Sequence, residues 1–115
     1  MLAPPPDTPN CVHSQAPPSD TVHAIEPLHF EGDPTAAWAR LDDVVMAMPR
    51  VERVVDEPAY RQYVFTTALW RFKDDVQFEL HDQVIHFRSA SRVGRSDLGV
   101  NRKRMESIRN AFQKR

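Results

Sequence analysis

Two short stretches of alternating apolar and polar residues, joined by a polar turn, constrain the fold of this chain more than any other feature. Apolar residues occupy every second position over 76–80 and again over 85–87, and His81-Asp82-Gln83 lies between the two stretches. Alternation with a period of two is typical of a strand that is buried on one face and solvated on the other. The sequence therefore predicts an antiparallel hairpin in the core of the fold.

The register of this hairpin follows from keeping the apolar side chains on one face. Pairs whose residue numbers add up to 165 place Phe78 opposite Phe87 and Gln77 opposite Arg88, whether the loop has two or four residues. A shift of one residue would move a phenylalanine to the solvated face, so the first register is favoured. In this register the Arg88 side chain projects from the face opposite Phe87.

Two amphipathic helices flank the strands. The first is predicted to begin at Asp33-Pro34, with Asp33 as N-cap and Pro34 at the first helical position, and to end at Pro49. The second closes the chain, with Ser96 or Asp97 as its expected N-cap. The apolar stripes have helical spacing and consist of Trp38, Leu41, Val44, Val45 and Met48 in the first helix and Leu98, Met105, Ile108 and Phe112 in the second.

Further strands are expected between the first helix and the hairpin. Residues 51–55 are rich in valine and are followed by Glu57-Pro58. Residues 60–70 carry aromatic and β-branched side chains on both alternating faces, so the core face stays open, and we expect a bulge or partial cover on both sides. Together these elements predict an α+β fold, an antiparallel β-meander with two amphipathic helices packed on one face.

The N-terminal segment is predicted to be extended. Six of the ten prolines lie within the first 18 residues, and proline fixes φ and removes a backbone donor. We therefore divide the chain into a Pro-rich extended arm over 1–20 and a single α+β domain over 21–115. At the start of the domain, Ile25, Leu28 and Phe30 are expected to dock on the sheet as an edge segment.

Charge is distributed unevenly along the chain. Residues 88–115 hold nine Lys and Arg against two Asp and Glu, whereas residues 1–87 hold six against fourteen, so that the net charge is −1. Such a division indicates either an anion-binding surface or two parts of one fold that attract each other. Because acids are interleaved and the pI is near 6.5, binding to duplex nucleic acid is not expected.

Targeting and membrane signals are missing from the sequence. Its apolar runs fall short of the roughly 20 residues of a membrane-spanning helix, and the N-terminus lacks the basic and apolar parts of a signal peptide. We therefore expect a soluble chain without a transmembrane segment, cytoplasmic as given. The compartment stays open, since an anchor or signal could have been trimmed. The single cysteine, Cys11, excludes an internal disulfide.

Metal binding and cysteine chemistry are not expected. Cys11, His13, His23 and His29 offer thiolate and imidazole ligands, but their spacing matches no standard metal site. Cys11 as a nucleophile would need a base and an orienting group, and neither lies nearby in the sequence. We predict a buried cysteine, scattered surface histidines, no metal and no cofactor.

Two other patterns resemble functional motifs without completing them. Gly94 and Gly99 have the spacing of a phosphate loop, but Val100-Asn101 follow where that motif requires Lys and then Ser or Thr. Asp74-Asp75 could form a carboxylate pair for acid–base work or cation binding, although adjacent acids before a strand more often form a turn or pair with nearby Arg71 and Lys73. A non-enzymatic role is therefore favoured, and an enzyme with an unrecognised site is kept as an alternative.

The strongest functional candidate is the Arg- and Ser-rich loop that precedes the last helix. Guanidinium groups, hydroxyls and the free amides of a helix N-terminus suit a phosphate, a sulfate or a carboxylate. The predicted anion-binding residues are Arg88, Ser89, Ser91, Arg92, Arg95 and Ser96. Alternatively, these arginines bind acids of the domain itself, such as Glu79 or Asp97.

The function predicted from these residues is that of a small binding domain for an anionic ligand or headgroup. The alternatives are a protein-interaction domain, which would use the Pro-rich arm or the basic helix for a protein partner, and an uncharacterised enzyme.

Several segments of the chain carry a resemblance to a known family. They are residues 9–12, 25–28, 71–72 with 74–76, and 87–94 with 96–102. Together they resemble the motifs of domain-of-unknown-function family fourteen ninety-nine, over nearly the whole chain. His13 departs from the pattern, because the family usually has a small serine there. The family has no assigned activity, so the resemblance implies relatives but no chemistry.

Overall fold

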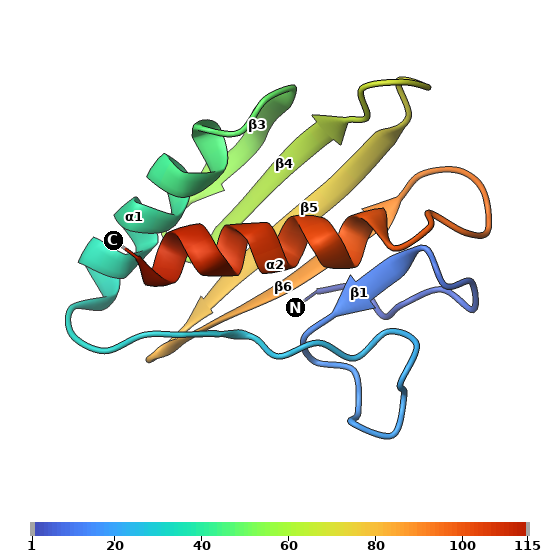
Figure 1. The fold of residues 1–115 in the computed structure, drawn as a ribbon. Helices are drawn as coiled ribbons and strands as arrows, with labels where there is room; N and C mark the ends of the chain where they lie inside the picture. The colour runs from blue at the N-terminus through green and yellow to red at the C-terminus, as the bar shows by residue number, and fades with distance from the viewer. Residues whose placement is uncertain (1, 115) are drawn as a thin grey trace.

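The computed structural model of the protein describes residues 2–114, and both helices lie on one face of an antiparallel sheet (Figure 1). The elements along the chain are β1 Cys11–His13, β2 Leu28–His29, α1 Pro34–Met46, β3 Val51–Glu57, β4 Tyr60–Thr66, β5 Lys73–His81, β6 Val84–Ser91 and α2 Val100–Gln113. The strand order is β1-β6-β5-β4-β3, and β2 also pairs with β6. The predicted α+β meander with two helices on one face is confirmed.

β5 and β6 form the predicted hairpin. Phe78 pairs with Phe87 and Gln77 with Arg88, so the register is the one that places the apolar side chains on a single face. The loop is a two-residue turn, and its first residue, Asp82, has a positive φ of 41°, as tight hairpin turns favour. Phe78 and Phe87 are fully buried, with ring centroids 6.2 Å apart.

β4 is shorter than the strand predicted over 60–70. It ends at Thr66, and Tyr63 and Phe65 are buried on the face that the helices cover. Because both faces of this segment carry apolar side chains, alternation alone cannot tell which face is buried. The position of the helices determines which face of β4 is in the core. A bulge is present, but it lies in the neighbouring strand β3, where Val54 falls at a shift in the pairing with β4.

α1 begins as predicted. The Asp33 Oδ1 atom accepts the amide N–H of Thr35 at 3.1 Å, and Pro34 is the first helical residue. The helix ends at Met46, shortly before Pro49, because the residue preceding a proline is disfavoured in the helical conformation. Four of the five predicted stripe residues are buried, together with Ala37; the buried members are Ala37, Trp38, Leu41, Val44 and Val45. Met48, the fifth, lies beyond the end of the helix and is only partly buried against the core.

α2 begins later than predicted. Its first residue is Val100, and the preceding Gly99 has a φ of 80°. Leu98 also has a positive φ, 56°, so an extra turn separates Asp97 from the helix. Neither Ser96 nor Asp97 is therefore the N-cap residue. The Asp97 carboxylate still accepts the amide N–H of Asn101 at 3.0 Å, because the turn folds back onto the first helical residues.

The buried face of α2 also differs from the prediction at one position. Met105, Ile108 and Phe112 are fully buried, as expected. Leu98 was predicted to join them but precedes the helix, and its side chain is 86% exposed. The buried position nearest the helix start is taken by Asn101.

The N-terminal segment is held along the outer edge of β6. β1, which lies within the predicted arm, pairs with β6, and β2 pairs with β6 further along, so the expected edge docking is confirmed. Arginines of the basic helix α2 secure this segment: Arg102 and Arg109 donate to the carbonyls of Ala24 and Pro27 at 3.0 and 2.8 Å. The division of the chain at residue 20 stays a prediction.

His23 links two parts of the N-terminal segment and is buried. Its Nδ1 lies 2.7 Å from Asp20 Oδ2, and its Nε2 lies 2.8 Å from the Thr8 carbonyl oxygen. Only the imidazolium can donate from both nitrogens. Burial lowers the pKa of His23, but the hydrogen bonds to Thr8 and Asp20 outweigh it and raise this pKa above its usual value. The contact with His23 holds the pKa of Asp20 below its usual range.

We expect His23 to stabilise the domain at mildly acidic pH and to lose this effect as the pH rises. A raised pKa in the folded state means that the stabilisation is complete below the usual histidine pKa and is lost above the raised one. The stabilisation by the Asp20 carboxylate depends on pH in the opposite direction, because it is lost as the pH falls through the lowered pKa of Asp20. The difference in the free energy of unfolding between wild type and His23→Gln should therefore shrink from about pH 6 to pH 8.

Urea unfolding across this pH range measures that difference. The comparison with the variant is needed because His13 and His86, whose pKa values burial lowers, change stability in the opposite sense. A difference that does not vary with pH would show that folding leaves the pKa of His23 unchanged, and a difference that grows with pH would show that folding lowers it.

Candidate functional site

Two loops lie at the same end of the sheet, where β4 and β6 finish (Figure 1). Residues 67–72 join β4 to β5, and residues 92–99 join β6 to α2. A pocket of about 450 Å³ lies between these loops. Its walls are apolar side chains from both loops, and Asp74, Ser91 and Asp97 are polar members of its lining. We call this cavity the apolar pocket.

The apolar pocket is surrounded by large side chains that water can reach. Leu69 and Trp70 are 79% and 72% exposed, and Leu98 is 86% exposed. Phe72 and Val93, which also line the pocket, are exposed as well. Exposed apolar side chains that gather in one place mark binding surfaces, whereas isolated ones do not. The sequence prediction missed this cluster, because it assigned Leu69 and Trp70 to a strand and Leu98 to a helix.

Each loop holds a non-glycine residue in the left-handed region. Arg71 has a φ of 60° and Leu98 a φ of 56°, conformations that cost of the order of 1–3 kcal/mol and cluster at ligand sites. Hydrogen bonds keep the loops in this form: the amide N–H of Phe72 donates to Thr67 Oγ1 at 2.9 Å, and that of Leu98 donates to Ser96 Oγ at 3.3 Å.

A buried polar network anchors the loop 92–99 beneath the apolar pocket. Asn101 is fully buried, and its Nδ2 donates to Asp97 Oδ2 at 2.6 Å and to Ser91 Oγ at 2.9 Å. Its Oδ1 accepts from Ser89 Oγ at 2.6 Å and from Arg104 Nη1 at 2.9 Å. The loop is therefore tied through one amide side chain to β6 and to α2.

The same network contains an ion pair and a contact from the N-terminal segment. Arg104 Nη2 donates to Asp74 Oδ2 at 2.6 Å, and the two side chains are only 8% and 1% exposed. The guanidinium of Arg104 also lies over the Phe65 ring, 4.7 Å from its centroid. From the other side, Asn10 Nδ2 donates to the Gly94 carbonyl at 2.7 Å. The loop is thus held from three directions.

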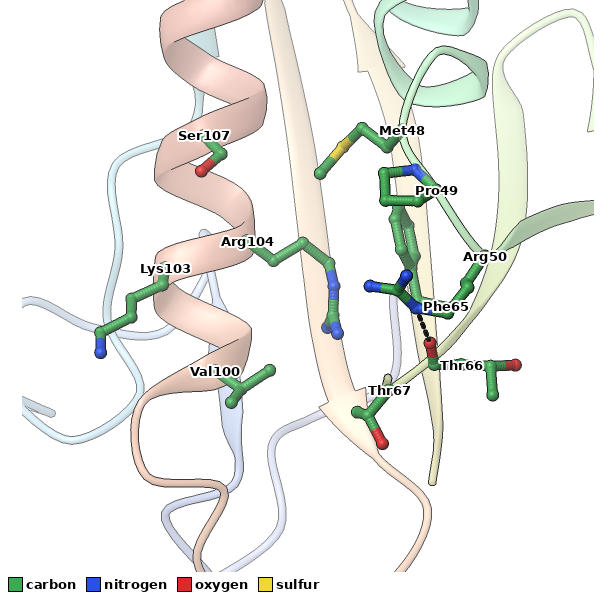
Figure 2. A pocket seen from close by; sticks show the side chains of 10 residues that line it. All are labelled: Met48, Pro49, Arg50, Phe65, Thr66, Thr67, Val100, Lys103, Arg104 and Ser107. Atoms are coloured by element: carbon green, nitrogen blue, oxygen red, sulfur yellow. Dashed lines mark hydrogen bonds between the residues drawn. The ribbon is translucent and has the colours of Figure 1, made fainter. Parts of the chain in front are cut away.

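A second pocket of about 250 Å³ adjoins the apolar pocket, and Thr67 and Val100 line both (Figure 2). Its basic lining residues are Arg50, Lys103 and Arg104. In Figure 2 the guanidinium groups of Arg50 and Arg104 come from opposite walls and point into the same space, while Lys103 extends away from them. We call this cavity the basic pocket.

Arg50 is positioned for a ligand in the basic pocket. Its backbone is in the left-handed region, with a φ of 56°. The Arg50 carbonyl accepts the amide N–H of Thr66 at 2.9 Å, and its Nε donates to the Thr66 carbonyl at 3.1 Å. Within residues 2–114 its terminal nitrogens have no hydrogen-bond partner in the structure, so they are available to an anion.

The structure divides the predicted anion-binding residues between two faces of the sheet. Ser89 and Ser91 face α2 and belong to the Asn101 network. Arg88 lies on the opposite face, and its Nε is buried without a hydrogen-bond partner among the described residues. Arg92 makes two hydrogen bonds of 2.9 Å to the carboxylate of Asp75.

Arg95 and Ser96, the last two predicted site residues, are exposed in the loop 92–99. Ser96 lines the apolar pocket together with Ser91. The six residues therefore do not meet at one point. Two of them reach the apolar pocket, and at least one arginine binds an acid of the domain.

The expected turn at Asp74 and Asp75, or their pairing with Arg71 and Lys73, is not what the structure shows. Both lie in β5, where adjacent side chains point to opposite faces of the sheet. Asp74 consequently meets Arg104 on the helix side, and Asp75 meets Arg92 on the other side. Both carboxylates pair with arginines, as predicted, but with arginines that are distant in the sequence.

Cys11 is fully buried, and burial raises the pKa of its thiol to about 11, so the thiol stays protonated at neutral pH. The expectation of surface histidines is wrong for His13 and His23, which are both buried because the N-terminal segment folds back on itself. Among the described residues, no three His, Cys, Asp or Glu side chains are grouped so that they could hold a metal ion. Whether the protein binds a metal stays a prediction.

The helices of the described part of the chain are too short or too polar to cross a bilayer. A family model for "Protein of unknown function (DUF1499)" matches residues 1–112. The chain belongs to this family. A comparison with curated proteins found no match.

Most of the segments by which the chain resembles DUF1499 proteins converge in space; the segment 25–28 is the exception, because Leu28 pairs near the start of β6. Residues 71–72 and 87–94 with 96–102 supply much of the apolar pocket and its polar network. The segment 9–12 contributes Asn10, whose side chain holds the loop 92–99. This convergence marks the two-loop end of the DUF1499 domain as its candidate functional site.

Proposed function

We propose that this DUF1499 domain is a non-enzymatic binding module for an anionic amphiphile, a small molecule that joins an apolar chain to a phosphate or carboxylate group. The observation that carries the proposal is the adjacency of the two pockets. One is lined by exposed apolar side chains and the other by guanidinium groups, and they share Thr67 and Val100. A ligand with two chemically different ends matches this arrangement.

The apolar pocket suits the chain of such a ligand. Leu69, Trp70 and Leu98 expose large apolar side chains to water in the free protein, and an apolar chain that covers them would remove this surface from water. Each methylene that leaves water contributes about 0.8 kcal/mol. The strained but hydrogen-bonded loops hold the walls in place before binding, which reduces the entropic cost of binding.

The basic pocket suits the anionic end. Arg50 offers two terminal nitrogens, and guanidinium groups bind phosphate and carboxylate oxygens through paired hydrogen bonds. Arg104 adds positive charge to the same space, although Asp74 partly neutralises it. The hydroxyl-bearing residues Thr67 and Ser107 also line this pocket and can donate to an oxyanion.

This proposal keeps the anionic ligand predicted from the sequence and changes where its charge is bound. Arg92 binds Asp75 and Ser89 binds Asn101, so each already has a partner within the domain. Arg95 remains a candidate, because it is exposed beside the apolar pocket. Variants at Arg50, Arg92 and Arg95 therefore distinguish an anion bound in the basic pocket from one bound at the loop 92–99.

A binding role is favoured over catalysis by the side chains that line the pockets. The described lining residues include no histidine or cysteine. The acids Asp74 and Asp97 are engaged by Arg104 and Asn101. A serine nucleophile would need a free neighbouring base; both carboxylates of the lining are engaged, and Lys103 extends away from the centre of the basic pocket (Figure 2). The protein-interaction alternative receives less support, since the arginines of α2 bind the domain's own backbone and acids.

Dodecyl phosphate below its micelle-forming concentration tests the proposal. It should raise the melting temperature of the wild type. A ligand that binds only the folded state increases the free energy of unfolding by RT ln(1 + [L]/Kd), which is about 2.7 kcal/mol at a hundredfold excess over Kd. Arg50→Gln should weaken binding roughly 10- to 100-fold, since a charge-assisted hydrogen bond contributes about 1.5–3 kcal/mol. Lys114→Gln, at the C-cap of α2, is the matched control.

The outcomes of this titration distinguish the alternatives. Loss of binding in Arg92→Ala or Arg95→Ala, with Arg50→Gln unaffected, would place the anion at the loop predicted from the sequence. No shift of the wild type with dodecyl phosphate would refute the proposed ligand class.

A further inference from the structure

We infer that the DUF1499 domain docks on the surface of a bilayer that contains anionic lipids, with the tips of loops 67–72 and 92–99 inserted among the headgroups. The inference rests on the proposed function, because it names a membrane as the source of the amphiphile. It is carried by three observations: where the exposed apolar side chains lie, which charges surround them, and where the apolar pocket opens.

The exposed apolar side chains are concentrated at the two loops. Six of the nine large hydrophobic residues that are exposed in the described part of the chain line the apolar pocket. The three most exposed of them, Leu69, Trp70 and Leu98, come from the two loops. Tryptophan is enriched at membrane interfaces, where its apolar ring and its N–H group meet both phases.

Basic side chains alternate with these apolar ones. Arg71 lies between Trp70 and Phe72, and Lys73 follows directly. Arg71 and Arg95 make no ion pair among the described residues, and the Lys73 ammonium donates to the hydroxyl of Thr66 at 2.8 Å. Of the nearby acids, Asp75 binds Arg92 and Asp74 binds Arg104. Asp97 accepts hydrogen bonds from Asn101 and keeps its charge, but Arg71, Lys73 and Arg95 outnumber it. The loop end of the domain is therefore positive, although the whole chain has a net charge of −1.

A bilayer with anionic lipids matches this surface better than a folded protein does. Each basic residue near such a surface strengthens binding about fivefold, and the interface accepts apolar loop tips without requiring a complementary shape. The apolar pocket opens between the same two loops. With the tips inserted, the chain of an amphiphile can enter the pocket from the bilayer without crossing water.

Vesicle co-flotation with the full chain tests the inference. Phosphatidylcholine vesicles that contain about 30% phosphatidylglycerol should carry the wild type, whereas pure phosphatidylcholine should bind it at least tenfold more weakly. High salt should release the protein from the anionic vesicles, because it screens the surface charge. Insertion should also shift the emission of the exposed Trp70 to shorter wavelength; Trp38 is buried already.

Two triple variants separate insertion from general hydrophobicity. Leu69→Ser with Trp70→Ser and Leu98→Ser should abolish flotation. The matched control, Val22→Ser with Met46→Ser and Val54→Ser, removes three exposed apolar side chains elsewhere and should float like the wild type. Thermal melting verifies that both variants fold. Equal flotation of the loop variant and the wild type would overturn the inference.

The two proposals can fail separately. Binding of dodecyl phosphate without flotation on either vesicle would overturn the membrane inference and leave the proposed function in place. Flotation that depends on the loop tips, without any binding of dodecyl phosphate and with Arg50→Gln unchanged, would support membrane docking and refute the amphiphile site.

Discussion

Replacement of Phe87 by alanine is expected to destabilise the domain by about 3–5 kcal/mol. Phe87 is fully buried on β6, and its ring packs against that of Phe78 between the sheet and the helices. Removal of the ring loses the free energy of its transfer from water and leaves a cavity that rigid neighbours fill only in part. Urea denaturation of the variant and the wild type measures the difference.

The matched control for Phe87 is Val54→Ala. Val54 is an apolar residue of the same sheet, but it lies exposed at the bulge of β3. Its truncation should change the free energy of unfolding by about 0.5 kcal/mol or less. If Phe87→Ala cost less than about 1 kcal/mol, the ring would not be part of a packed core.

Removal of Asp74 is expected to have an effect of similar size, about 3–5 kcal/mol, because it leaves the guanidinium of Arg104 buried without its counter-ion. Both side chains are almost completely inaccessible, and the ion pair also anchors the Asn101 network. Chemical denaturation of Asp74→Ala measures this loss. The loop 92–99 should become more mobile in the variant, which amide hydrogen exchange would detect.

A double variant distinguishes an uncompensated charge from simple loss of packing. Asp74→Ala combined with Arg104→Met removes both charges and keeps the apolar part of the arginine side chain. It should be more stable than Asp74→Ala alone, since a buried pair replaced by apolar groups is often nearly neutral. If the double variant lost as much as the two single variants added together, the two residues would not be coupled.

The uneven charge of the chain has a structural explanation in these pairs. Arg92 and Arg104, from the basic C-terminal part, bind Asp75 and Asp74 of the acidic part. Arg102 and Arg109 are used to hold the N-terminal segment. Much of the excess positive charge in residues 88–115 therefore binds other parts of the same domain.

Local patterns in the sequence determined the hairpin and the helices. The register of β5 with β6 follows from the alternation around Phe78 and Phe87, because a shift of one residue would expose phenylalanine. The start of α1 follows from Asp33 and Pro34, which act on the nearest amides. Each of these features depends on residues that are close in the chain or directly paired, so spacing and residue type are enough to predict it.

Only the tertiary structure decided the core face of β4, the extra turn before α2 and the pockets. Asp74 meets Arg104 across 30 residues, and Asn10 holds Gly94 across 84. Leu98 has the right spacing for the stripe of α2, but the loop that Asn101 and Asn10 anchor holds it outside the helix. A periodic pattern records which side chains share a face, whereas a site between two loops depends on contacts that form only once the sheet and helices have brought distant segments together.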